Sequence, residues 1–165
     1  MSDKNYILTR EVAEKKLRRM AYEIVERNAG ESHLILAGIK ESGLIIAKKV
    51  KDLLQPIYKG ESSVIEISLD KRNPIEINIS PSIDLRDNII IVTDDVVNSG
   101  RTLLYALKPF LSFPVKKIQT LVLVERTHKA FPVTSDYVGL SVATTVQEHI
   151  VVEAEEGEIS GAYLI

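Results

Sequence analysis

The stretch NIIIVTD, residues 88–94, constrains the fold more than any other part of the chain. It is apolar at nearly every position, instead of at alternate positions, and it is rich in isoleucine. Such a strand is buried on both faces, which is typical of a central strand in a sheet that helices cover on both sides. The run KKIQTLVLVER, residues 116–126, has the same character. We therefore expect an α/β protein with a central, mostly parallel sheet.

The remaining patterns alternate between helix and strand along the chain, as such a sheet requires. Thr9 is the expected N-cap of a first helix, and Pro109 should end or kink the last helix near Lys108. We predict helices over 8–28, 42–55 and 100–111, and strands over 33–38, 63–70, 74–80, 88–94, 116–126, 135–143 and 148–156.

Length and composition exclude several classes of protein. The 165 residues fit one domain, so we treat 1–165 as a single domain. The absence of cysteine excludes disulfides, thiolate catalysis and cysteine-ligated zinc. A net charge of −2 argues against a protein that coats nucleic acid. No apolar run approaches the ~20 residues of a membrane span, and the polar start MSDKNYILTR lacks the apolar core of a signal peptide. We expect a cytoplasmic protein with no membrane segment.

The segment DDVVNSGRT, residues 94–102, follows the central strand at the edge where α/β sheets bind ligands. Adjacent acids can serve one ligand only where a strand gives way to a loop, so we expect the strand to end at Asp94 and Asp95. Residues 98–102 then open a helix, whose free N–H groups suit a phosphate, and Gly100 permits a close approach. A phosphorylated sugar carries hydroxyls that suit the two acids and a phosphate that suits the N–H groups of the helix. A helix cap with two solvated acids explains the local pattern equally well.

Together with the apolar residues before it, this segment resembles a known motif. IIVTDDVVNSGRT, residues 90–102, resembles the phosphoribosyl-pyrophosphate signature of the type I phosphoribosyltransferases: four apolar residues, two acids and a small-residue loop. Thr93 stands where an apolar residue is usual, and Ser99 replaces the commoner threonine. AYEIVERN, LAGIKESG and LVLVERTHKAFPVTSDYVG extend the resemblance, from about Tyr6 to Val152, to the pyrimidine operon attenuator/uracil phosphoribosyltransferase branch.

This resemblance implies a fold, an assembly and partners. The fold would be the type I phosphoribosyltransferase fold, α/β with a central, mostly parallel sheet flanked by helices. A small hood built from the N- and C-terminal segments would lie over the base site. The protein would act on phosphoribosyl pyrophosphate and a nucleobase, and it would be a homodimer or a higher homo-oligomer.

The resemblance also implies a role for each matching residue. Asp94, Asp95 and Arg126 are the residues expected to be catalytic, and Asp94 and Asp95 would hold the implied cofactor, Mg²⁺, directly or through water. The ribose and its 5-phosphate would be bound by Asp94, Asp95, Val97, Asn98, Ser99, Gly100, Arg101 and Thr102. Pyrophosphate would be bound by Gly38, Ile39, Lys40, Lys71 and Arg72.

The implied reaction moves the 5-phosphoribosyl group from phosphoribosyl pyrophosphate to a nucleobase, uracil in this branch, with release of pyrophosphate. Its transition state resembles an oxocarbenium ion. Catalysis would rest on holding the ring, neutralising pyrophosphate and excluding water. No side-chain nucleophile is required, which agrees with the lack of cysteine.

Three departures from this branch leave an alternative open. Glu41 and Ser42 stand where threonine and arginine are usual, which brings negative charge toward pyrophosphate. The segment between Ile67 and Asp84, where a closing loop belongs, is shorter, and RTHKAFP at 126–132 replaces RGHRELP. The alternative is a catalytically weak or inactive regulator that binds a phosphoribosyl ligand or nucleotide. Such a regulator could bind RNA. RNA binding would require a basic face on the protein, which the slightly acidic chain does not favour.

Overall fold

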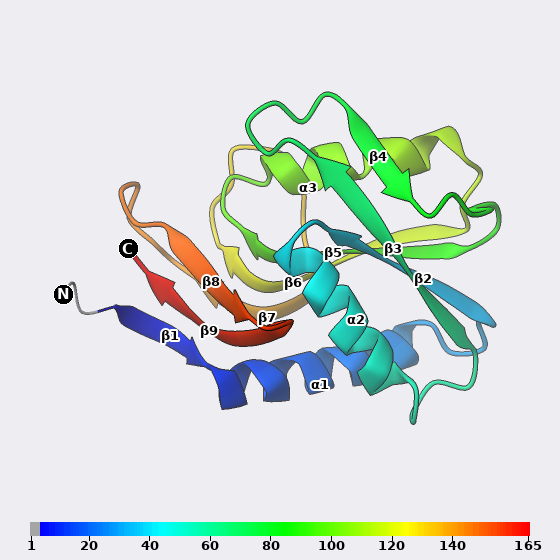
Figure 1. Cartoon of the computed structure of the whole chain (residues 1–165), viewed down its shortest axis with the longest axis horizontal. Helices are drawn as coiled ribbons and strands as arrows, with labels where there is room; N and C mark the ends of the chain where they lie inside the picture. Colours follow the sequence, from blue (N-terminus) through cyan, green and yellow to red (C-terminus); the bar gives the residue numbers. More distant parts are fainter. Residues whose placement is uncertain (1–3) are drawn as a thin grey trace.

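The computed structural model describes residues 4–165, which form two β-sheets and three α-helices (Figure 1). The strands are β1 (Asn5–Thr9), β2 (His33–Ile39), β3 (Glu61–Leu69), β4 (Ile77–Ser80), β5 (Ile89–Val97), β6 (Lys117–Arg126), β7 (Tyr137–Val142), β8 (Ile150–Glu155) and β9 (Glu158–Leu164). The α-helices are α1 (Arg10–Arg27), α2 (Ser42–Leu54) and α3 (Arg101–Ala106), and a 3₁₀ helix, η1 (Lys108–Ser112), follows α3.

The larger sheet has the strand order β4-β3-β2-β5-β6-β7. All neighbouring strands are parallel except β4, which pairs antiparallel with β3 at one edge. β5 lies between β2 and β6, and its residues 89–95 are all buried. These observations confirm the prediction of an α/β protein whose mostly parallel sheet is built around the isoleucine-rich strand.

Alternate residues of β5 enter two separate cores, one on each face of the sheet. Ile89 and Ile91 pack in the core that contains the buried side chains of α1 and α2. Ile90 and Val92 pack in the other core, with α3 and Phe110 of η1. Because helices cover both faces, every position of the strand must be apolar.

The helix boundaries follow the local sequence. The Thr9 hydroxyl accepts a hydrogen bond from the N–H of Val12, which confirms Thr9 as the N-cap of α1. α3 ends at Ala106, and Pro109 lies in the 3₁₀ helix that follows. The predicted break near Lys108 is therefore confirmed, because proline cannot donate the next hydrogen bond of an α-helix.

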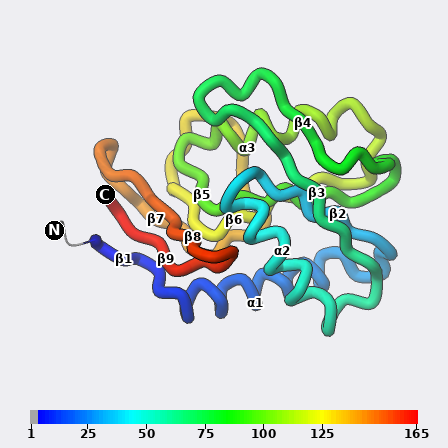
Figure 2. Tube along the Cα trace, viewed as in Figure 1, coloured from blue at the N-terminus to red at the C-terminus, as the bar shows by residue number. Residues whose placement is uncertain are grey.

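A second, antiparallel sheet has the strand order β1-β9-β8. β1 is paired with β9, so Asn5 lies opposite Leu164, and the two ends of the described chain run side by side (Figure 2). β8 was predicted, but β1 and β9 were not. The acidic stretch around Glu156 is the turn of the β8–β9 hairpin, where Glu156 and Gly157 both have positive φ.

Two strand boundaries in the larger sheet differ from the prediction. β4 begins at Ile77 instead of residue 74, because the N–H of Ile75 donates to Asn73 in a tight turn, 2.9 Å, and Pro74 has no N–H. β5 continues past the acids, and Val96 is still paired with Val124 of β6. The prediction that the strand ends at Asp94 and Asp95 is therefore wrong. Within residues 4–165, no helix combines the length and the apolar character that a membrane crossing needs.

Candidate active site

Asp94 and Asp95 lie near the carboxyl end of β5, and both are buried, with 2% and 7% of their surfaces exposed. Each carboxylate binds the backbone directly after it. Oδ1 of Asp94 accepts from the N–H of Asp95, and Oδ1 of Asp95 accepts from the N–H of Val96, both at 2.9 Å. These local bonds hold two neighbouring acids at the end of a buried strand while it is still paired.

The charge of Asp94 is poorly solvated. Burial raises the pKa of the Asp94 carboxyl well above its usual range, and the neighbouring charge of Asp95 raises it further. The ammonium group of Lys71, in the turn between β3 and β4, acts in the opposite direction. A cation at this position would therefore relieve a real electrostatic cost.

The loop of residues 98–102 borders a small cavity of about 140 Å³ beside Asp94. Gly100 has φ of +85° and is the N-cap of α3, and the Ser99 hydroxyl accepts from the N–H of Arg101 at 3.2 Å. The cavity is lined by Lys71, Asp94 and residues 96–103. The structure thus brings together all the residues predicted for the sugar and the 5-phosphate except Asp95, which adjoins Asp94.

Two side chains of this loop have distinct surroundings. Oδ1 of Asn98 is buried and has no hydrogen-bond partner within residues 4–165, so the cavity wall contains an acceptor that is not satisfied. Arg101 lies over the ring of Tyr105, one turn further along α3, at 5.9 Å. The loop therefore contains one unsatisfied amide oxygen beside the N–H groups at the start of α3.

The start of α2 lies next to the acids. The Thr93 hydroxyl donates to the carbonyl of Gly43 at 2.8 Å, and a Cβ added to Gly43 would lie 2.6 Å from the carbonyl oxygen of Thr93. A Cβ on Gly38 would lie 2.5 Å from Cα of Leu44. Both glycines are required for the start of α2 to pack this closely on the sheet.

A second cavity, of about 440 Å³, is lined by Lys40, Glu41, Ser42, Leu69 and Lys71. Lys71 also lines the 98–102 cavity, so it borders both spaces. The Lys40–Glu41 peptide bond is cis. Two cations and one carboxylate thus converge where pyrophosphate was predicted.

Three predicted residues lie outside these cavities. Ile39 is only 1% exposed, and its side chain packs in the core. The backbone of α2 at Leu44 packs directly against Gly38. Arg72 is exposed beside Lys71, and its N–H donates to the carboxylate of Asp70 at 2.9 Å. Pyrophosphate contacts by these three residues stay predictions.

Arg126, the last residue of β6, contacts the loop that leads from β7 to β8. Its guanidinium donates to the carbonyls of Thr145 and Glu148, the latter at 3.4 Å, and Glu148 in turn accepts from the N–H of Thr145 at 2.8 Å. Nε of Arg126 is buried with no partner in the described chain. Arg126 does not line the 98–102 cavity, so a direct catalytic contact is a prediction that the structure leaves open.

The segment 127–133, which contains most of the RTHKAFP stretch, forms a wall behind the 98–102 loop. The carbonyl of Ser99 accepts from the N–H groups of Ala130 and Phe131, at 3.0 and 3.1 Å. A Cβ on Gly100 would lie 2.8 Å from Cγ1 of Val133. Lys129 of this wall pairs with Glu125 of β6 at 3.2 Å. No short motif links these residues, because the contacts join separate segments.

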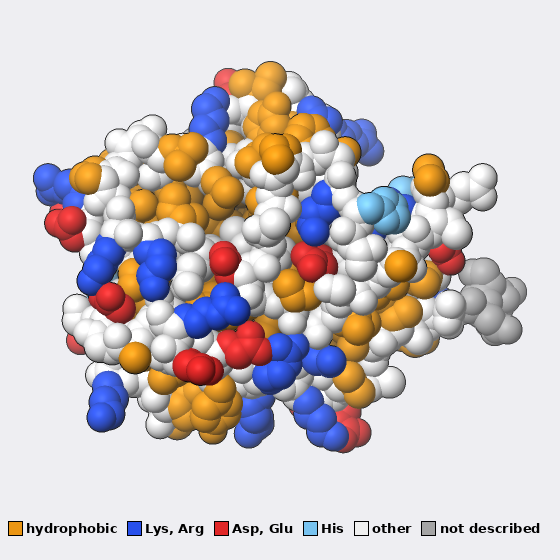
Figure 3. Space-filling model, turned by 180° about the vertical axis from the view of Figure 1, so that it is seen from behind, with side chains coloured by type: hydrophobic (Ala, Val, Ile, Leu, Met, Phe, Trp, Pro, Cys, Tyr) orange, Lys and Arg blue, Asp and Glu red, His pale blue; other side chains and the backbone are white. Residues whose placement is uncertain are grey.

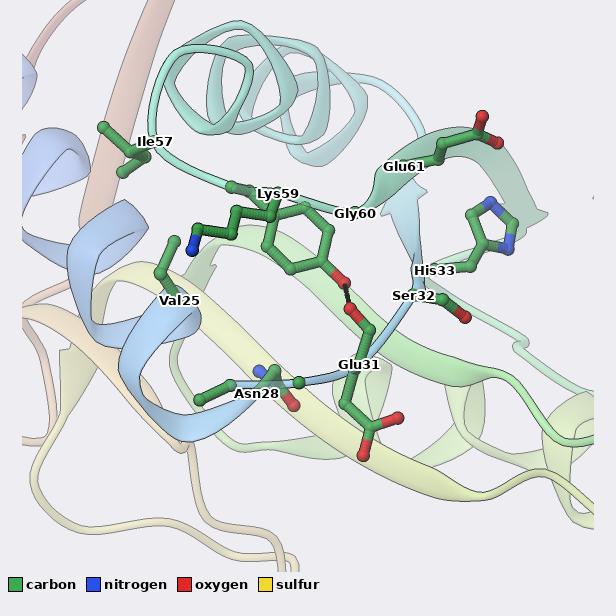
Figure 4. Close-up of a pocket in the computed structure, with 12 residues that line it drawn as sticks. Val25, Asn28, Glu31, Ser32, His33, Ile57, Lys59, Gly60 and Glu61 are labelled. Carbon is green, nitrogen blue, oxygen red and sulfur yellow. Dashed lines mark hydrogen bonds between the residues drawn. The ribbon is translucent and has the colours of Figure 1, made fainter.

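A larger cavity, of about 870 Å³, lies away from the acids. It is lined by residues around His33 and Glu61, which are the first residues of β2 and β3, whereas Asp94 lies near the carboxyl end of β5 (Figure 4). The Tyr58 hydroxyl donates to the carbonyl of Glu31 across it at 2.7 Å. None of the predicted site residues lines this cavity, so volume alone does not identify the active site.

Comparison with known proteins identifies the family of the chain. A family model described as a phosphoribosyl transferase domain matches residues 5–156. The bifunctional protein PyrR of Ligilactobacillus salivarius is 34% identical, and the match covers 85% of each chain. The bifunctional protein PyrR of Bacillus subtilis is 30% identical, covering 94% of this chain and 93% of the relative.

Solved structures share the fold at lower sequence identity. The hypoxanthine phosphoribosyltransferase of Trypanosoma cruzi superposes with a TM-score of 0.78 at 13% identity, covering 97% of this chain and 95% of the other. A hypoxanthine-guanine phosphoribosyltransferase of Bacillus anthracis gives 0.74 at 19% identity, covering both chains completely. The extent of these matches and the buried acids at the end of β5 lead to one assignment. The chain belongs to the phosphoribosyltransferase domain family, has its type I fold, and is related to the bifunctional PyrR proteins.

Proposed function

We propose that this phosphoribosyltransferase moves the 5-phosphoribosyl group from phosphoribosyl pyrophosphate to uracil, with release of pyrophosphate. The observation that carries the proposal is the buried Asp94–Asp95 pair beside the cavity of the 98–102 loop. The acids suit the ribose hydroxyls, and the N–H groups at the start of α3 suit the 5-phosphate. Uracil is the base implied by the resemblance to the pyrimidine branch.

The side chains act by holding the sugar while the bond at ribose C1 breaks. Asp94 and Asp95 fix the hydroxyls, and the loop fixes the 5-phosphate, so the ring is held at two ends. The base nitrogen attacks C1 and gives up its proton to water as the C1–O bond breaks and pyrophosphate leaves with its electron pair. Lys40 and Lys71, which line the neighbouring cavity, stabilise the charge that develops on pyrophosphate.

The acids also fit a magnesium ion. Oδ1 of each carboxylate accepts a backbone N–H, and the two neighbouring carboxylates interact with each other. Within residues 4–165 no group of three acidic or histidine side chains could enclose a metal, and Mg²⁺ is commonly held by one or two carboxylates with substrate oxygens and water. When bound, Mg²⁺ would neutralise charge on the pyrophosphate oxygens. Asp94 and Asp95 are the residues that would hold it.

One observation favours a second candidate, a regulator with little catalysis. Glu41 lines the same cavity as Lys40 and Lys71, and its negative charge opposes the binding of pyrophosphate there. RNA binding by such a regulator has weaker support, because the net charge is −2 and the face in Figure 3 shows acidic and basic side chains close together instead of one basic patch.

Three further features belong to the same proposal. The chain would assemble as a homodimer or a higher homo-oligomer and would act in the cytoplasm. The sheet of β1, β9 and β8 would be the hood over the base, within one domain that covers 1–165. The assembly and the hood follow from the resemblance to the pyrimidine branch, whereas the single domain follows from the chain length and the cytoplasmic location from the composition.

Pyrophosphate release tests the proposal directly. The protein is mixed with Mg²⁺, phosphoribosyl pyrophosphate and each common base in turn, and pyrophosphate is measured. Turnover is expected with uracil, and faster turnover with another base would correct the substrate. Absence of turnover with every base, together with calorimetric binding of phosphoribosyl pyrophosphate, would favour the regulator. If neither is observed, both candidates fail.

A further inference from the structure

The ion pair between Glu125 and Lys129 is well shielded from solvent. Its side chains are 16% and 13% exposed and their charged atoms lie 3.2 Å apart, and the Ser141 hydroxyl also donates to Glu125 at 3.0 Å. The pair Glu11–Lys15 has the same spacing in sequence, but its side chains are 76% and 72% exposed. A shielded pair keeps more of its attraction and holds its geometry better than an exposed one.

This pair connects two parts of the protein that meet at the 98–102 loop. Glu125 is paired across the sheet with Val97, which lines the cavity, so its backbone is fixed relative to the site. Lys129 belongs to the wall behind the loop, and a Cβ on Gly100 would lie 3.5 Å from its Cδ. The ion pair therefore ties the wall to the strand beside the site.

The wall in turn holds the 98–102 loop by its backbone. The next two residues after Lys129, Ala130 and Phe131, both donate to the carbonyl of Ser99. A carbonyl held from behind fixes the peptide plane that it shares with the N–H of Gly100, and so fixes which way that N–H points. Lys129 itself is not among the residues that line the cavity.

We infer that Glu125 and Lys129 are positioning residues that hold the wall against Ser99 and so keep the N–H groups of the 98–102 loop directed at the 5-phosphate. This inference rests on the proposed function for the identity of the ligand. The arrangement of the loop itself can be measured without a ligand. Lys129 acts through Ser99 and makes no direct contact with the phosphate.

The test uses K129M and E125Q, which remove one charge each and keep most of the side-chain volume. Both variants should raise the KM for phosphoribosyl pyrophosphate roughly 5- to 10-fold and change kcat by less than about 2-fold, because the interaction acts on binding. In the free proteins, amide hydrogen exchange at residues 98–102 should be faster than in the wild type. K15M breaks the exposed pair and should leave both measurements unchanged.

The two single variants separate positioning from direct contact. If Lys129 met the phosphate itself, E125Q would leave a cation in place and would keep or improve binding, and that result would overturn the inference. The double variant E125Q/K129M should be no worse than either single one. Unchanged exchange at 98–102 in both single variants also overturns the inference, even when the wild type turns over. A wild type without pyrophosphate release overturns the proposed function, and the exchange data then still decide whether the pair holds the loop.

Discussion

The hydroxyl of Thr93 donates a 2.8 Å hydrogen bond to the carbonyl oxygen of Gly43. Thr93 directly precedes the two acids, and Gly43 lies in the first turn of α2, so this buried bond joins the sugar end of the site to the pyrophosphate end. An apolar residue, usual at this position in the family, could not make it. The bond compensates for placing a polar side chain in the middle of an apolar strand.

Replacing Thr93 by valine should therefore destabilise the protein, because the Gly43 carbonyl loses its buried donor. We expect a loss of about 1–2 kcal/mol in the free energy of unfolding. T93S keeps the hydroxyl and should recover most of that loss. Urea unfolding of the three proteins measures the difference, and a T93V variant as stable as the wild type would show that the hydrogen bond contributes nothing.

Gly100 should tolerate substitution far less well than Gly157. Both have positive φ, +85° and +78°, so alanine costs about 1 kcal/mol of backbone strain at either site. Only at Gly100 would the new Cβ also meet Val133, at 2.8 Å, whereas nothing lies within 4 Å at Gly157. G100A should weaken the binding of phosphoribosyl pyrophosphate at least about 10-fold, since the loop must move. Calorimetry should show wild-type affinity for G157A; equal losses in both variants would contradict the steric argument.

The D94N variant should be more stable than the wild type at neutral pH and nearly inactive. The pKa of Asp94 is raised in the folded protein, so the wild type loses stability as pH rises from the usual carboxyl value to the raised one. Asparagine does not titrate, so D94N does not lose stability in this way. The difference in free energy of unfolding between D94N and the wild type should therefore be near zero in acid. It should grow as the pH rises from the usual carboxyl pKa to the raised one, and then stay constant. Thermal unfolding at several pH values measures this gain, and a gain independent of pH would contradict it. Turnover should fall at least about 100-fold.

Arg126 should act mainly on the loop that it holds. R126A removes the donors to the carbonyls of Thr145 and Glu148, so amide exchange over residues 143–149 should become faster. Because this loop leads into the smaller sheet, the KM for the base should rise more than the KM for phosphoribosyl pyrophosphate. R126K retains the charge but cannot contact two carbonyls in the same way. It should therefore restore little of the wild-type exchange protection or of the wild-type KM for the base. A fall in kcat alone, with unchanged exchange, would instead support a catalytic contact.

The parts of the site that come from one continuous segment could be predicted from the sequence. Asp94 lies in β5 and the 98–102 loop follows this strand directly, and the apolar pattern of the strand fixes its place in the sheet. Lys71 was also placed near the site, although the distance along the chain is larger. The prediction for Asp94 and the loop depends on a short-range pattern whose physical meaning does not require knowledge of the rest of the fold, whereas the one for Lys71 depends on the resemblance to the family.

The parts that depend on contacts between separate segments could not be predicted in this way. The pairing of β1 with β9 joins segments at opposite ends of the chain, and neither has a pattern strong enough to stand alone. The ion pair of Glu125 and Lys129 reads in the sequence as two ordinary charges. Ile39 looks available in a glycine-flanked loop, but it is the last residue of β2 and its side chain enters the core. In each case tertiary packing decides the outcome.

The position of β9 between β1 and β8 sets an order for the assembly of the chain. All six strands of the larger sheet lie within residues 33–142, so this sheet can form while β9 is still absent. The smaller sheet requires the last strand of the described chain to find the first, and closing so long a loop has a large entropic cost that is recovered only when the pairing is complete. We therefore expect the smaller sheet to form late in folding, and until β9 pairs with it, β1 leaves backbone N–H and C=O groups that another chain can pair with.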